Sequence, residues 1–148
     1  MRSVLMFKPS EKKSQKSHQL INQIFIEKVE DADKYTVVYA YYMKRGIFSQ
    51  TMYSYIIGFS VPDKEIIVIP ITSDTNESGD AINLTKENIQ SAKYGLQGDV
   101  KIKSDILEKD LRFMVPGFTP PSLENAYVLP ILQEDAAVKF KAFIKENL

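Results

Sequence analysis

The chain contains no cysteine and no tryptophan, and His18 is its single histidine. Disulfide bonds, thiolate nucleophiles and sulfur-ligated metal sites are therefore excluded. A catalytic triad or a histidine relay would depend on His18 alone, near the N-terminus, where chain ends are commonly mobile. We expect His18 to be a solvent-exposed helix residue.

Neither sign of charge is in excess, because 19 lysines and arginines balance 19 aspartates and glutamates. Affinity for nucleic acid grows with each neutralised phosphate, so DNA or RNA is not expected as the main partner. No apolar run approaches the roughly 20 residues that cross a bilayer. The apolar patch Val4–Phe7 is also shorter than the core of a signal peptide. We predict a cytoplasmic protein without a transmembrane segment.

The common nucleotide-binding and hydrolase motifs are absent as well. The sequence has no G-x-x-x-x-G-K-[ST], G-x-G-x-x-G or G-x-S-x-G pattern. We therefore predict no cofactor and no catalytic residue. Acidic side chains at predicted turns leave a small carboxylate enzyme open as an alternative. These residues are Asp63, Glu65, Asp105, Glu108 and Asp110.

The length and composition fit one globular domain. With 148 residues, 44% of them hydrophobic and 26% charged, the chain can bury a core without disulfides or metals. Residues 1–13 are predicted to form a flexible basic leader, because Lys8, Lys12 and Lys13 face only Glu11 there. Residues 14–148 form the predicted domain.

Two amphipathic helices are predicted, one near each end. From Ser14 to Val29 the apolar residues recur at intervals of three and four, as on one helical face. The same spacing marks Leu132 to Leu148, where acidic residues stand early and lysines late, as the helix dipole favours. A brief helix is also predicted over residues 85–94, with Thr85 as its cap and Gly95 at its end.

Alternating aromatic and β-branched residues predict strands between these helices. Residues 34–43, 48–59 and 65–72 form a predicted meander, with a short strand near Ile82 and Leu84. Residues 99–103 and 111–115 are predicted to pair. The expected fold is α+β, with a bent antiparallel sheet or a partly open barrel packed against both helices.

The segment from Asp74 to Asp80 has the oxygen side chains of a calcium loop at alternate positions: Asp74, Asn76, Ser78 and Asp80. Gly79 also stands at the sixth place. The twelfth place is Thr85, however, where such loops need a bidentate glutamate. We interpret the segment as a polar connection and predict no metal site.

A basic turn follows the first strand and provides the candidate binding residues, Tyr42, Lys44 and Arg45. Adjacent cations can bind phosphate or anionic lipid head groups, and tyrosine suits an interface with one wet side. Turn geometry and solubility are the alternative explanation for the same residues.

The order of these elements resembles that of pleckstrin-homology-like domains, including their bacterial and GRAM-type relatives. The resemblance rests on the hairpin from Tyr35 to Phe59 with Lys44 and Arg45, the strand Leu111–Val115 and the last helix. It implies a bent barrel capped by that helix, and ligand binding near the first hairpin. The usual tryptophan of the capping helix is missing, so Phe140 or Phe143 would take its place.

We therefore predict a non-catalytic binding domain whose ligand is a protein or an anionic head group. A homo-oligomeric structural protein is a further alternative, because eight tyrosines and eight phenylalanines are many for one core of this size.

Overall fold

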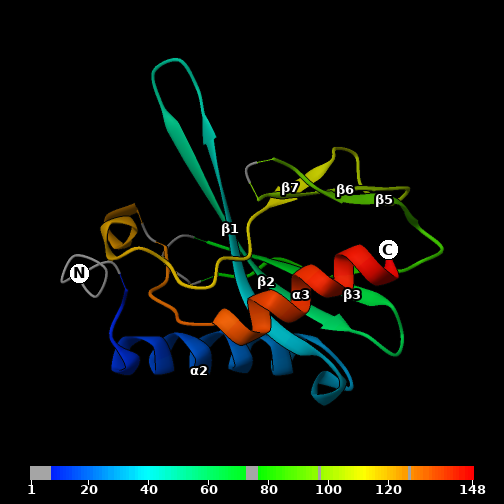
Figure 1. Cartoon of the computed structure of the whole chain (residues 1–148), viewed down its shortest axis with the longest axis horizontal. Helices are drawn as coiled ribbons and strands as arrows, with labels where there is room; N and C mark the ends of the chain where they lie inside the picture. Colours follow the sequence, from blue (N-terminus) through cyan, green and yellow to red (C-terminus); the bar gives the residue numbers. More distant parts are fainter. Residues whose placement is uncertain (1–7, 73–76, 97, 127) are drawn as a thin grey trace.

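The computed structural model describes residues 8–72, 77–96, 98–126 and 128–148. It confirms the predicted α+β class, with two antiparallel sheets and a helix near each end of the chain (Figure 1). Within the described residues, no helix combines the length and apolar character that crossing a membrane requires. The elements are α2 (Glu11–Lys28), η1 (Ala32–Lys34), β1 (Thr36–Arg45), β2 (Gln50–Ser60), β3 (Glu65–Ile71), β4 (Ile82–Leu84), β5 (Ile89–Tyr94), β6 (Val100–Ser104), β7 (Leu111–Phe113), η2 (Pro121–Ala126) and α3 (Glu134–Asn147).

The strands form a four-stranded sheet in the order β1-β2-β3-β4 and a three-stranded sheet in the order β5-β6-β7. The two sheets meet at one isolated bridge between Tyr41 and Met114, which exchange both backbone hydrogen bonds at 3.1 and 2.8 Å. The sequence left open whether the sheet closes, and the structure has two sheets rather than a closed barrel.

The four-stranded sheet is buried on both faces, because alternate side chains enter two separate cores. Ile66 and Val68 pack with α3 and the three-stranded sheet, whereas Ile67 and Ile69 pack with α2. This division explains why β3 is a nearly continuous run of isoleucine and valine.

The predicted C-terminal helix is present as α3, and its aromatic residues lie at the centre of the larger core. The Phe59 ring lies 5.3 Å from both the Phe140 and the Phe143 ring, and Phe113 lies 5.9 Å from Phe140, measured between ring centroids. Both phenylalanines of α3 are thus buried.

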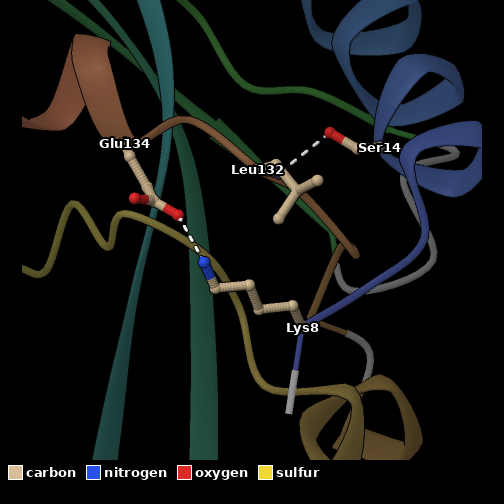
Figure 2. A network of polar contacts seen from close by, with 4 residues as sticks. All are labelled: Lys8, Ser14, Leu132 and Glu134. Atoms are coloured by element: carbon tan, nitrogen blue, oxygen red, sulfur yellow. Dashed lines mark hydrogen bonds and ion pairs between the residues drawn. The ribbon is translucent and has the colours of Figure 1, made fainter. Parts of the chain in front are cut away.

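The N-terminal helix begins at Glu11, three residues before the predicted start. Ser10 is its N-cap, and its hydroxyl accepts a hydrogen bond from the backbone of Lys13 at 3.2 Å. Lys8 also contacts the domain, since its Nζ lies 2.9 Å from Glu134 Oε1 (Figure 2). Lys8 and the buried Pro9 therefore contact the domain, and residues 11–13 form the first turn of α2. The flexibility of residues 1–13 stays a prediction.

Side chains of α2 bind the segment that leads into α3. The Ser14 hydroxyl accepts a hydrogen bond from the backbone N–H of Leu132 at 2.8 Å (Figure 2). His18 is half-buried, and its Nε2 lies 2.8 Å from the carbonyl oxygen of Leu132. The expectation of a solvent-exposed His18 was wrong, because the docked segment covers this face of the helix.

The prediction of a helix over residues 85–94 was also wrong. A single turn forms, in which Ile89 donates to the Thr85 carbonyl at 2.9 Å, and residues 89–94 then form β5. Pairing with β6, for example Ala92 opposite Ile102, satisfies their backbone groups instead. Pairing with a strand later in the chain thus stabilises residues 89–94 as a strand, although the local sequence favours a helix.

The β1–β2 hairpin projects beyond the rest of the domain (Figure 1). Lys44 and Arg45 are the last two residues of β1, not the turn as predicted, and Arg45 pairs with Gln50. The connecting residues 46–49 carry Ile47 and Phe48, whose exposed fractions are 91% and 99%. The hairpin tip is therefore apolar, with the basic pair immediately behind it.

Candidate binding site at the hairpin base

A cleft of about 630 Å³ opens between the base of the hairpin and the three-stranded sheet. We call it the hairpin cleft. It combines aromatic, thioether and charged side chains from β1, β7 and the segments beside them. Its lining residues are Tyr41, Tyr42, Met43, Arg45, Asp99, Arg112, Met114 and Leu123.

The cleft lies along the edge of β1 that faces away from β2. Among the described residues, this edge is bridged to the chain after β7 at Tyr41 and Met114. Past this bridge, residues 42–45 pair only with β2 among the named strands, as the hairpin leaves the body of the domain. Side chains of β7 and of the hairpin therefore face each other across the cleft.

Arg112 is the central cation of the cleft. Its guanidinium carbon lies 5.9 Å from the centre of the Tyr42 ring, within cation–π range. Its Nε lies 3.5 Å from Asp99 Oδ2, and the Asp99 carboxylate is the more buried of the two groups. Tyr42 and Asp99 hold the guanidinium between them. Its terminal nitrogens make no hydrogen bond to any described residue, so they can bind an anion.

Two of the three predicted binding residues line this cleft, Tyr42 and Arg45. Arg45 is exposed and forms no ion pair with a described residue. Lys44 is the third predicted residue and is not among the residues that line the cleft. Arg112 and Asp99 were not identified from sequence, since only the pairing of distant strands brings them to β1.

A row of cations continues from Arg112 across the outer face of the three-stranded sheet. Lys93 of β5 stands opposite Lys101 of β6, which stands opposite Arg112 of β7. We call these three residues the cation row. Asp110 Oδ2 lies 3.5 Å from Lys101 Nζ. Like charges directly opposite each other weaken a sheet. Asp110 and Asp99 offset part of this repulsion, and a bound anion would reduce it further.

The loop that resembles a calcium site lies partly outside the described residues, since Asp74 and Asn76 are not among them. The backbone carbonyls of Ser78 and Gly79 accept hydrogen bonds from Lys28 Nζ at 3.3 and 2.9 Å. A lysine therefore already binds carbonyl oxygens here. Across the described ranges, no three acidic or histidine side chains form a group that could hold a metal ion.

The acidic residues of the enzyme alternative lie at two turns and have separate partners. Asp63 pairs with Lys34 at 2.8 Å, which raises the pKa of that lysine. Glu65 accepts a hydrogen bond from the Tyr35 hydroxyl at 2.9 Å. At the β6–β7 turn, Asp105 and Asp110 lie next to Gln90 and Lys101, while Glu108 is exposed.

Comparisons with models of known protein families, with curated proteins and with solved structures found no match to this chain. A function must therefore be inferred from the chain's own residues.

Proposed function

We propose that this is a non-catalytic binding domain that docks on anionic lipid head groups. The contacting face would combine the hairpin cleft, the cation row and the projecting hairpin. The observation that carries the proposal is the cation row, with Arg45 and the Tyr42 ring lining the same cleft as Arg112.

The arrangement of the elements supports a broad contact. The hairpin and the three-stranded sheet lie on the same side of the domain, and α2 lies on the opposite side (Figure 1). Val100 and Ile102 are buried on the inner face of that sheet, so Lys101 points outward. Each lysine or arginine near an anionic surface contributes about 1 kcal/mol, and added salt screens this attraction.

The hairpin itself has the composition of a lipid-facing segment. Residues 36–60 contain Lys44 and Arg45 but no aspartate or glutamate. Ile47 and Phe48 at the tip could enter the head-group layer while the two cations remain at its surface. Tyr53, which is exposed on β2, suits the same boundary.

The order of the elements also supports a pleckstrin-homology-like architecture for this domain. A four-stranded sheet, a three-stranded sheet and a C-terminal helix follow one another in that order. The helix α2 is an addition, and phenylalanines stand where relatives usually have tryptophan. A cytoplasmic location belongs to the same proposal, since the lack of cysteine is compatible with a reducing compartment.

Vesicle sedimentation tests the proposal. We expect binding to vesicles of phosphatidylcholine mixed with phosphatidylserine, and none to phosphatidylcholine alone. Replacing both arginines of the cleft, Arg45→Gln/Arg112→Gln, should weaken binding about 30-fold, since two cations are lost.

The matched control removes the same charge from the opposite side of the domain. Lys12 and Lys16 are exposed on α2, and the Lys12→Gln/Lys16→Gln variant should bind within about twofold of the unmodified chain. Equal losses in the two variants, or binding that ignores phosphatidylserine, would reject the proposal. Thermal unfolding of each variant checks that the fold is retained.

A further inference from the structure

A second apolar surface lies at the other end of β1. A groove of about 630 Å³ runs between the end of α2, η1 and the start of β1. We call it the acidic groove. Its wall includes Ile26, Val29, Tyr35 and Val37, and Ile26 is 66% exposed although it is a large apolar residue.

Three carboxylates lie in or beside this groove. Asp31 and Asp33 line it, and Glu30 is exposed next to them. None of these three forms an ion pair with a described residue. The nearest lysines in the sequence are already engaged, because Lys28 binds the carbonyls of residues 78 and 79, and Lys34 pairs with Asp63.

The hairpin tip is the chemical complement of the acidic groove. Ile47 and Phe48 are almost fully exposed, as stated above, and Lys44 and Arg45 stand directly behind them. Neither cation forms an ion pair with a described residue. The tip thus offers two apolar side chains and two positive charges, while the groove offers an apolar wall and a negative rim.

The tip of a molecule cannot reach the groove of the same molecule. The groove includes Tyr35 and Val37 at the start of β1, and the tip follows Arg45 at its end. An extended strand rises about 3.3 Å per residue, so the two surfaces lie about 30 Å apart. We propose that the acidic groove binds the hairpin tip of a second copy of this chain.

This contact joins different surfaces of the two molecules, so it leaves a free tip at one end and a free groove at the other. Such heterologous contacts extend into open chains unless a rotation closes them. A hairpin tip is small beside the roughly 1,600 Å² of a stable interface, so the association should be weak and depend on concentration. Salt should weaken it further.

The inference does not rest on the proposed lipid binding, and it is tested without lipid. Sedimentation velocity at low salt should show an average mass that rises with concentration past that of a dimer. A tip variant, Phe48→Ser, and a groove variant, Ile26→Ser/Asp33→Asn, should each remain monomeric. Both sets of side chains are exposed, so the variants should fold.

Mixing the two variants provides the decisive measurement. The tip variant retains an intact groove and the groove variant retains an intact tip, so the mixture should form a one-to-one dimer that grows no further. Val138→Ser, which removes an exposed apolar residue of α3, is the control and should assemble like the unmodified chain. A monomeric unmodified chain, assembly of the tip variant, or a mixture that stays monomeric would overturn the proposal.

Discussion

The side chain of Gln133 binds both backbone groups of Tyr39, as a neighbouring strand would. Its Oε1 accepts the Tyr39 N–H at 2.9 Å, and its Nε2 donates to the Tyr39 carbonyl at 2.8 Å. The same nitrogen lies 2.9 Å from the carbonyl oxygen of Pro116. Both residues are buried, and no described strand pairs with β1 on this side at Tyr39. The Gln133 amide therefore supplies hydrogen-bond partners to both backbone groups of Tyr39 at the edge of β1. It also holds the start of α3 against this strand.

Gln133→Ala should lower the free energy of unfolding by about 2 to 4 kcal/mol, because it leaves two buried backbone groups without partners. Urea denaturation measures the change. Gln19→Ala removes the same amide from an exposed position of α2 and should cost less than about 0.5 kcal/mol. A loss below about 1 kcal/mol for Gln133→Ala would show that water replaces the amide.

Gly58→Ala should destabilise the domain by about 1 to 3 kcal/mol, because overpacking forces neighbours to move. A Cβ at Gly58 would lie 2.3 Å from Cζ of the buried Phe25 ring. Gly79→Ala is the control, since its nearest neighbour would be Pro70 at 3.5 Å, an ordinary contact. Thermal unfolding should show a clearly lower melting temperature for Gly58→Ala than for Gly79→Ala.

Shortening the opposing ring should partly relieve this clash. Phe25→Leu alone loses buried area, but Phe25→Leu/Gly58→Ala should cost less than the sum of the two single changes. A double-mutant cycle by urea denaturation measures the coupling. Strict additivity would mean that the Gly58 backbone moves away from Phe25 instead of the ring.

Alkaline pH should destabilise the domain in part through Tyr94. Burial raises the pKa of Tyr94 to about 12, from its ordinary value of 10.0. The fold therefore favours the neutral phenol, and this contribution is complete below pH 10 and lost as the pH rises towards 12. Tyr94→Phe should lose less stability than the unmodified chain across that interval. Urea denaturation at several pH values measures the free energy of unfolding of both proteins. An equal decrease with pH in the unmodified chain and in Tyr94→Phe would contradict this expectation.

Calcium should leave the melting temperature unchanged. The loop that contains Ser78 and Asp80 lacks the bidentate glutamate of a calcium site, and Lys28 binds two of its carbonyls. Differential scanning calorimetry with millimolar calcium or with a chelator checks this prediction. A rise of several degrees with calcium would mean that the loop rearranges to bind the ion.

Local periodicity predicted the elements whose burial repeats along the chain. The apolar stripe of α3 and the alternation of β1 and β2 follow directly from which faces are buried, so short windows contain them. The run of isoleucine and valine from Ile66 to Ile69 likewise follows from the burial of β3 in two cores. These predictions needed no knowledge of distant residues.

The errors lie where a distant segment supplies the partner. Residues 89–94 pair with β6, and His18 meets the carbonyl of Leu132, which is far along the chain. Neither partner leaves a signal in the local pattern, so a window that contains only one side predicts a helix or an exposed histidine.

The same reasoning applies to the residues of the proposed binding site. Tyr42 and Arg45 belong to one short segment, so the sequence alone identified them as a basic aromatic pair. Arg112 and Asp99 join them only because β7 meets β1 at the bridge between Tyr41 and Met114. Residue spacing cannot encode that meeting, since it arises when two sheets pack around one apolar core and bring separate strand edges together.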